Sequence, residues 1–187
     1  MESINHREPT HVKNAFDLDF LDEIVKSSKK LFTPVNNNGG YSGAEDKNIS
    51  YNRQTWPIHN LNVLESKLRE QIEDINNTNY QFDLHYVENI MYAEYKSKNK
   101  SKLDWHIDIG PHPYNERKLS FIIFTNDPSE YEGGQLQIWT DNNQYTNIPK
   151  SIGGIVVFPS FLPHRVTPVT KGIRKVIIGF VNGNPYK

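Results

Sequence analysis

Gly153-Gly154-Ile155-Val156-Val157-Phe158-Pro159-Ser160 is the stretch of sequence that decides the fold. The two glycines predict a turn, the four apolar residues a buried strand, and the Pro-Ser pair the end of that strand. Segments of the same β-branched and aromatic character, separated by clusters of Gly, Pro, Asn and Asp, recur at 83–95, 119–125, 135–140 and 174–182. The second half of the chain is therefore predicted to consist mainly of strands.

Two amphipathic helices are predicted in the first half of the chain. Apolar residues recur at helical spacing over 18–31, after Asp17 as a candidate N-cap, and again over 61–75, where Asn76-Asn77 should end the helix. The polar segment 36–52 between them reads as an exposed connection, or alternatively as a mobile lid over a substrate site.

Helices followed by many short strands predict a mainly β fold with flanking helices. Its core would be a double-stranded β-helix, a jelly roll of the cupin-like kind. The 187 residues suit a single domain, 1–187, with helical support over roughly 1–79 and the barrel core over roughly 80–187.

Composition excludes several classes of function. The net charge of −1 and the sequence pI of about 6.7 disfavour nucleic-acid binding and give no sign of membrane-surface binding. Cysteine is absent, so disulfides, thiolate metal sites and cysteine nucleophiles are excluded. With a polar stretch over 1–10 and no apolar run of membrane-spanning length, the sequence predicts a cytoplasmic protein.

Candidate metal ligands occur in two separate motifs. Trp105-His106-Ile107-Asp108 places a histidine and an aspartate two positions apart, so in an extended segment both side chains point to the same side. If His164 arrives from a neighbouring strand, it completes a set of two histidines and one carboxylate. Such a facial triad binds Fe(II) and leaves coordination positions open for a co-substrate and oxygen.

Arg174 is a candidate anion-binding residue. It lies ten positions after His164 and opens the apolar run Val176-Ile177-Ile178-Gly179-Phe180-Val181. Burial of a guanidinium among apolar side chains costs free energy unless the group pairs with an anion. The planar arrangement of its N–H donors suits a carboxylate. The alternative is an internal salt bridge to an Asp or Glu residue.

As an ordered set, the motifs resemble the Fe(II)/2-oxoglutarate-dependent dioxygenases, in the branch of the prolyl 4-hydroxylases and related bacterial and phage hydroxylases. The resemblance covers roughly residues 80–182. The matching runs are Trp105–Asp108, Arg117–Ser120, Tyr131–Leu136, Gly154–Ser160, Pro163–Val169 and Gly172–Arg174.

The resemblance implies roles for individual residues. His106, Asp108 and His164 would be the catalytic iron ligands, and Arg174 would pair with the distal carboxylate of the co-substrate 2-oxoglutarate. Tyr95 occupies the place of a tyrosine that often hydrogen-bonds this co-substrate, with Tyr92 as the candidate if the register is shifted.

The chain departs from the family pattern at two positions. Classical prolyl 4-hydroxylases usually have lysine where this chain has Arg174, which loosens the link to collagen-type substrates. Phe124 stands where some prolyl hydroxylases carry a tyrosine near the co-substrate, and Ser120 is the residue that could compensate for the lost hydroxyl.

The implied reaction uses O2 to convert 2-oxoglutarate to succinate and CO2 and hydroxylates an unactivated C–H bond, with ascorbate as a conceivable reductant. A prolyl residue in a peptide or protein is the first candidate substrate by analogy, while a free amino acid, another side chain or a small metabolite remains open. The oligomeric state is also open. Residues suggested for substrate contact are Arg53, Trp56, His112 and Trp139.

Two other classes of protein are compatible with the barrel. A cupin-like metal-dependent isomerase or hydrolase would share the histidines but would have no need for Arg174. A non-catalytic jelly-roll binding module would use Trp and Tyr to stack on sugars, and its ligand binding would survive replacement of His106.

Overall fold

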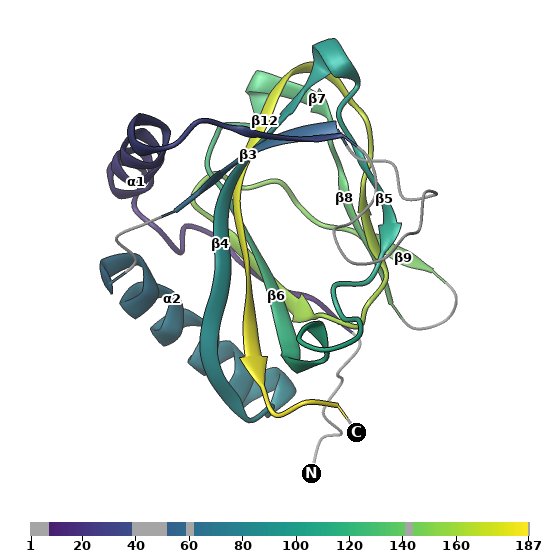
Figure 1. Cartoon of the computed structure of the whole chain (residues 1–187). Coiled ribbons are helices and arrows are strands. Elements are labelled where there is room, and N and C mark those ends of the chain that lie inside the picture. The colour runs from purple at the N-terminus through teal and green to yellow at the C-terminus, as the bar shows by residue number, and fades with distance from the viewer. Residues whose placement is uncertain (1–7, 39–51, 59–61, 141–143, 187) are drawn as a thin grey trace.

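Two antiparallel sheets face each other across the interior of the molecule in the computed structural model, which describes residues 8–38, 52–58, 62–140 and 144–186 (Figure 1). The major sheet runs in the order β1 (Thr10–Val12), β10 (Ile155–Pro159), β6 (Arg117–Phe124), β12 (Val169–Gly183), β4 (Leu84–Lys96), β3 (Asn52–Pro57) and β2 (Val35–Asn38). A further strand, β7 (Tyr131–Gly133), pairs with β12.

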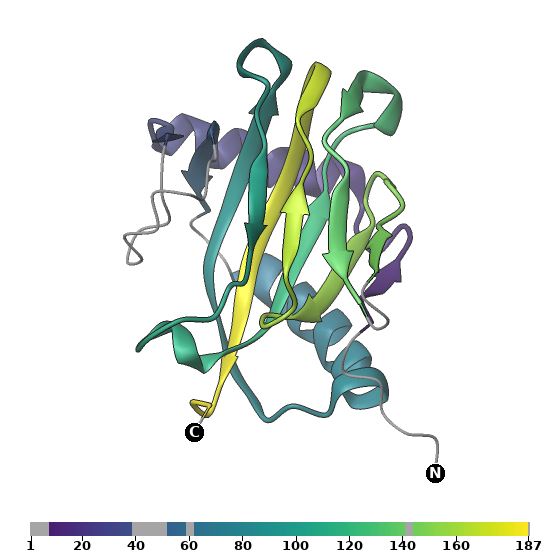
Figure 2. The ribbon, with the colours of Figure 1, turned by 90° about the vertical axis from the view of Figure 1, so that its right-hand side faces the viewer.

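The minor sheet contains four short strands, ordered β5 (Leu103–His106), β11 (His164–Val166), β8 (Leu136–Trp139) and β9 (Tyr145–Asn147). Figure 2 shows it standing in front of the long strands of the major sheet. Together the sheets form the predicted mainly β fold with a double-stranded β-helix core.

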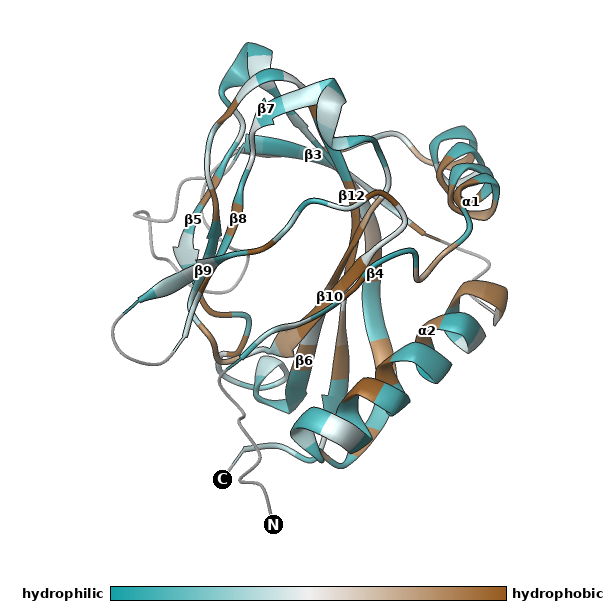
Figure 3. Ribbon diagram, turned by 180° about the vertical axis from the view of Figure 1, so that it is seen from behind, coloured by the Kyte–Doolittle hydropathy of each residue, from teal (hydrophilic) through white to brown (hydrophobic). Residues whose placement is uncertain are grey.

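The central strands of the major sheet are buried on both faces, which explains why their sequences are apolar runs. On β6, Leu119 and Ile123 pack in the core below the helices, whereas Ile122 and Phe124 face the barrel interior. Because successive side chains of a strand point to opposite faces, each central strand contributes to both cores. Figure 3 shows the resulting hydrophobic colour on the central strands β6, β10 and β12.

Helices α1 (Leu18–Leu31) and α2 (Asn62–Ile75) cover the outer face of the major sheet (Figures 1 and 3). As predicted, Asp17 caps α1, where its carboxylate accepts a hydrogen bond from the backbone N–H of Phe20 at 3.0 Å. α2 ends at Ile75, so the predicted end of this helix at Asn76-Asn77 is confirmed. A π-helical turn, η1 (Asn76–Tyr80), follows directly. This turn ends at Gln81, whose backbone is in the left-handed conformation.

The other helical elements of the described residues are short 3-10 turns: η2 (Ser97–Asn99), η3 (Tyr114–Glu116) and η4 (Pro128–Glu130). No helix in the described ranges has the length and apolar character needed to cross a membrane.

The division into helical support before residue 80 and barrel after it was too simple. β1, β2 and β3 all lie before residue 80, and all join the major sheet. Segment 36–52 is not a loop at its ends, because β2 and β3 pair there in antiparallel fashion. Residues 39–51, on which the lid hypothesis rests, lie outside the described residues.

Candidate active site

His106 and His164 lie side by side because their strands are neighbours. β5 and β11 pair in antiparallel register with His164 opposite His106, and the two ring centroids are 4.1 Å apart. This is the adjacent-strand arrangement predicted from the sequence. Asp108 lies just beyond the end of β5, rather than within a continuous extended segment. One carboxylate oxygen nevertheless lies 3.4 Å from His106 Nε2 and the other 3.3 Å from His164 Nε2.

Backbone contacts fix the tautomer of both imidazoles. His106 Nδ1 lies 2.8 Å from the carbonyl oxygen of Asp104, and His164 Nδ1 lies 3.0 Å from that of Leu162. A carbonyl oxygen only accepts, so both Nδ1 atoms carry the proton and both Nε2 lone pairs are turned toward Asp108. Burial, and next the neighbouring His106, lower the pKa of His164 to about 4, which keeps this ring neutral near pH 7.

Asp108 is held by three different contacts. Its side chain accepts a hydrogen bond from Ser120 Oγ at 2.7 Å, and its backbone N–H donates to the carbonyl of Ser160 at 2.9 Å. Its own backbone carbonyl accepts from the guanidinium of Arg117 at 3.1 Å. Burial by itself would raise the pKa of Asp108, but His164, His106 and Ser120 together lower it below its ordinary value, so the carboxylate is ionised.

These three side chains suit a divalent cation. Their donor atoms all lie within 4.8 Å of one another, and all three residues are buried. Two imidazole lone pairs and one carboxylate converge on a common space, so they would repel one another unless a positive charge lies between them. Mixed nitrogen and oxygen donors suit non-haem iron, whereas magnesium prefers oxygen ligands throughout.

Arg174 forms the second polar feature of the site. Its side chain is only 1% exposed, and none of its three guanidinium nitrogens makes a hydrogen bond. The guanidinium carbon lies 5.0 Å from the ring centre of Tyr95 and 5.8 Å from that of Phe124, so its surroundings are aromatic rather than anionic. Burial lowers the pKa of this arginine, which expresses the cost of a buried cation without a counter-ion.

The internal salt bridge that the sequence allowed for Arg174 is thus absent from the described part of the chain. The orphaned guanidinium is the strongest indication that an anion belongs in this pocket.

Tyr95, rather than Tyr92, faces Arg174. The two residues are opposite one another on β4 and β12, and the Tyr95 hydroxyl accepts a hydrogen bond from Arg53 at 2.6 Å. Tyr92 points to the other side of the sheet, where it packs on Trp56 and its hydroxyl donates to Glu94 at 3.0 Å. The register of β4 therefore selects Tyr95.

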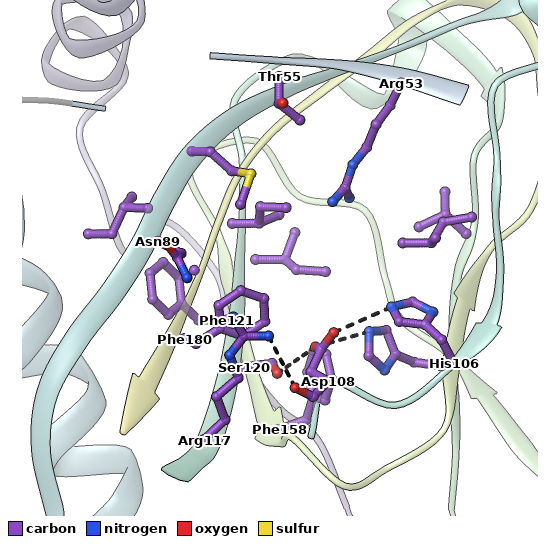
Figure 4. A pocket seen from close by; sticks show the side chains of 18 of the residues that line it. Arg53, Thr55, Asn89, His106, Asp108, Arg117, Ser120, Phe121, Phe158 and Phe180 are labelled. Atoms are coloured by element: carbon purple, nitrogen blue, oxygen red, sulfur yellow. Dashed lines mark hydrogen bonds and ion pairs between the residues drawn. The ribbon is translucent and has the colours of Figure 1, made fainter. Parts of the chain in front are cut away.

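One cavity of about 440 Å³ joins the histidine–aspartate cluster to Arg174. Figure 4 shows Arg53 reaching from β3 toward the cluster, with Ser120 and Arg117 on the other side of Asp108. Further lining residues are Val35, Thr55, Asn89, Met91, Tyr114, Phe121, Phe158, Ile178 and Phe180. The volume and mostly apolar lining are typical of a small-molecule site.

Of the four residues suggested for substrate contact, only Arg53 lines the cavity. Trp56 is buried in the core between helices and sheet, and His112 is largely exposed. Trp139 packs edge to face with Trp105 in the minor sheet, at a centroid distance of 5.7 Å, and does not line the cavity. The three residues other than Arg53 therefore lie outside the cavity lining.

Ser120 was expected near the co-substrate, to compensate for Phe124. Ser120 lines the cavity, and its hydroxyl donates to Asp108 and lies 3.0 Å from Ser160 Oγ. Arg117, which was assigned no role, contacts Asp108 directly. The sequence does indicate a role for Arg117, since Arg117, like Arg174, is a cation at the start of an apolar strand.

The barrel, the two histidines with one carboxylate and the buried arginine together define the class of non-haem iron dioxygenases that use 2-oxoglutarate. The family model of the 2OG-Fe(II) oxygenase superfamily matches residues 90–182, and the chain belongs to this superfamily. Members use Fe(II), 2-oxoglutarate and O2, so the protein is a 2-oxoglutarate-dependent oxygenase, an oxidoreductase.

Similar proteins are hydroxylases by name. A PKHD-type hydroxylase of Cupriavidus metallidurans is 29% identical over 171 residues, which cover 87% of this chain and 72% of the relative. A PKHD-type hydroxylase of Prochlorococcus marinus is 34% identical over 96 residues, covering 51% of this chain and 42% of that relative.

Solved structures of low sequence identity share the fold. A prolyl-4-hydroxylase of Pseudomonas putida has a TM-score of 0.70 at 16% identity, covering 95% of this chain and 94% of the other. A prolyl hydroxylase of Trichoplax adhaerens, solved with a peptide fragment of a hypoxia inducible factor, has a TM-score of 0.73 at 18% identity, covering 94% and 83%.

Proposed function

We propose that this protein is an Fe(II)- and 2-oxoglutarate-dependent hydroxylase that acts on an unactivated C–H bond of a peptide or protein substrate and releases succinate and CO2. His106, Asp108 and His164 would hold the iron, and Arg174 would bind the distal carboxylate of 2-oxoglutarate. The observation that carries this proposal is the buried, unpaired guanidinium of Arg174 in the same cavity as the three candidate ligands.

Bound Fe(II) would supply the redox chemistry by which one oxygen atom of O2 enters succinate and the other enters the substrate. The protein's own residues orient and insulate that chemistry. The Nδ1 contacts of the two histidines fix their Nε2 atoms toward the metal position, and Ser120 and Arg117 hold Asp108 in place.

The closed end of the cavity fits one particular kind of anion. A guanidinium flanked by two aromatic rings can pair with a carboxylate in a bidentate manner. Tyr95 presents a second polar group beside it, with its hydroxyl already accepting from Arg53. A dicarboxylate could therefore place one end against Arg174 and its other end at the metal.

A prolyl residue is the first substrate to test. The Pseudomonas and Trichoplax proteins are prolyl hydroxylases by name, and the latter was solved with a peptide. The apolar wall formed by Met91, Ile178 and Phe180 suits a compact apolar group such as a pyrrolidine ring. The alternatives of a cupin-like isomerase or hydrolase and of a sugar-binding module leave Arg174 without a partner.

The first experiment is anaerobic titration of Fe(II) and 2-oxoglutarate, followed by visible absorption difference spectra. We expect a charge-transfer band that is absent in Arg174→Met because the co-substrate is lost, and absent in His164→Ala because the metal is lost. Arg165→Met is the matched control, since Arg165 contacts Gln137 and Trp105 and does not line the cavity. Bound iron without a band in the wild type would overturn the proposal.

Substrate class is tested by succinate release. The panel comprises capped pentapeptides of the form acetyl-Gly-Ala-X-Ala-Gly-amide, with X as Pro, Lys, Leu, Asp or Asn, together with the corresponding free amino acids. We expect the proline peptide to stimulate succinate formation above the level without substrate. Stimulation by free amino acids alone would replace the peptide proposal by a small-molecule one.

A further inference from the structure

Asn89 occupies an irregular point in the cavity wall. Along β4 and β12, Glu88 pairs with Phe180 and Met91 pairs with Ile178, so Asn89 and Ile90 together oppose the single residue Gly179. This is a β-bulge, a feature that is enriched beside active sites and re-aims side chains. Asn89 itself has a φ of 50°, in the left-handed region that few residues other than glycine adopt.

The bulge brings two consecutive polar residues to the cavity side of β4. Glu88 accepts a hydrogen bond from Arg117 Nε at 2.7 Å, and Asn89 lines the cavity. Figure 4 shows Asn89 beside Phe180 and Phe121, across the cavity from His106. Asn89 is exposed, and the ladder between β3 and β4 ends at Met91, two residues further along β4. Within the described residues, its side-chain amide makes no hydrogen bond.

This end of the cavity is electrically balanced. Arg117 is the cation here, and its charge is offset by Glu88. The guanidinium of Arg117 stacks on Phe180 at 3.7 Å and on Tyr114 at 4.6 Å, so aromatic rings occupy much of the wall. A charged substrate group would find no counter-charge beside Asn89. A neutral group that offers both a donor and an acceptor would match the carboxamide.

We propose that Asn89 is a specificity-determining residue that hydrogen-bonds a main-chain amide of the peptide substrate, next to the residue that is hydroxylated. A peptide unit presents one N–H and one C=O, which are the complements of the carboxamide oxygen and nitrogen. This inference rests on the proposed function and adds the chemical group by which the peptide would be recognised. Strain in the backbone at a cavity wall is a common mark of such residues.

Two variants separate recognition from backbone geometry. Asn89→Gly keeps the left-handed conformation at no steric cost and removes the amide, while Asn89→Asp keeps the shape and replaces the N–H donor by an acceptor. Asn14 is the matched control, because it has a φ of 53° and does not line the cavity. The same changes at Asn14 should leave peptide turnover unchanged.

The experiment measures kcat/KM for the most active pentapeptide of the panel, Mn(II) and 2-oxoglutarate affinities, and Tm. For both Asn89 variants we expect kcat/KM to fall about tenfold, the equivalent of one lost hydrogen bond, mostly through KM. Metal and co-substrate affinities should stay within about twofold and Tm should not fall. A peptide with an ester in place of the amide that Asn89 contacts should have a lower kcat/KM than the amide peptide with the wild type. With Asn89→Gly, the two peptides should have the same kcat/KM.

Unchanged kcat/KM in Asn89→Gly, or a loss accompanied by equal losses at Asn14, would overturn the assignment. Loss of 2-oxoglutarate affinity together with turnover would also overturn it, since Asn89 would then serve the co-substrate end. If the wild type turns over no peptide, the proposed substrate class is wrong, and the proposed role of Asn89 is wrong with it. That outcome is visible before any variant is made.

Discussion

Arg117 donates a hydrogen bond to the backbone carbonyl of Asp108 across 3.1 Å. It is a buried arginine held on its other sides by Glu88 and by the rings of Phe180 and Tyr114. Asp108 lies beyond the end of β5, where the hydrogen bonds between strands no longer fix the backbone. The contacts with Arg117, Ser120 and Ser160 hold Asp108 in place of those hydrogen bonds.

Replacement of Arg117 should therefore weaken metal binding. We expect Arg117→Met to lower the Mn(II) affinity by about tenfold or more, as is usual when a partner of a metal ligand is lost. Electron paramagnetic resonance of free Mn(II) measures this without any turnover. The change Arg165→Met, at a half-buried residue that does not line the cavity, should leave the Mn(II) affinity unchanged. Unaltered Mn(II) affinity in Arg117→Met would mean that Ser120 and Ser160 suffice to hold Asp108.

Ser120 offers a test between two roles. If it acts through Asp108, as the 2.7 Å hydrogen bond indicates, Ser120→Ala should lower Mn(II) affinity by about tenfold. If it contacts the co-substrate, Mn(II) affinity should be unchanged and only the KM for 2-oxoglutarate should rise. Ser129→Ala, at an exposed turn, serves as the control.

The central strands of the major sheet were predictable because their apolar runs are long. The predicted segments 119–125 and 155–158 agree closely with β6 and β10. β5 and β11, which carry the histidines, were not among the strand segments predicted from composition, since they have only four and three residues and contain polar side chains. Short strands of this kind are defined by their pairing partners rather than by their own composition.

The candidate ligands were predictable from spacing because strand alternation is a local property. The contacts that hold them were not. Ser120 and Arg117 reach Asp108 from β6, twelve and nine residues further along the chain, and only the register of the sheet decides which side chain faces inward. The bulge at Asn89 has the same origin, because it depends on the offset between β4 and β12.

The Lys29–Glu94 ion pair should stabilise the attachment of α1 to the major sheet. Burial of Glu94 would by itself raise the pKa of this carboxyl, but Lys29, Tyr92 and Lys96 lower it below its ordinary value. The stabilisation is thus present above the pKa of a glutamate in the unfolded chain and is lost as the pH falls through the lower folded pKa. We expect Glu94→Gln to lower the free energy of unfolding by about 1–2 kcal/mol at pH 7.

Urea unfolding of wild type and Glu94→Gln at several pH values checks this. The difference should shrink as the pH is lowered below the usual range of a glutamate. A difference that is independent of pH would show that Glu94 acts through packing and hydrogen bonding rather than through its charge. Glu65→Gln on the exposed side of α2 is the control for loss of one carboxylate.

Gly134 should be required for co-substrate binding, although it lies outside the cavity lining. It has a φ of 58°, and a Cβ built there would lie 2.9 Å from Arg174 Cδ and 2.9 Å from Val169 Cγ2. Alanine at this position would be strained in its backbone and would push against the stem of the arginine. We expect Gly134→Ala to raise the Kd for 2-oxoglutarate by about tenfold, since a guanidinium moved by a few tenths of an ångström loses bidentate geometry.

Isothermal titration of the Mn(II)-loaded protein with 2-oxoglutarate measures that constant, and Mn(II) affinity measured in parallel should remain that of the wild type. Gly110→Ala is the matched control, because its nearest neighbour would be Tyr114 Cβ at an ordinary 3.7 Å and its φ is not in the left-handed region. If Gly134→Ala binds 2-oxoglutarate like the wild type, Arg174 has room to adjust and the glycine serves the turn alone. If metal and co-substrate binding are lost together, the substitution has disturbed the barrel as a whole rather than the anion pocket.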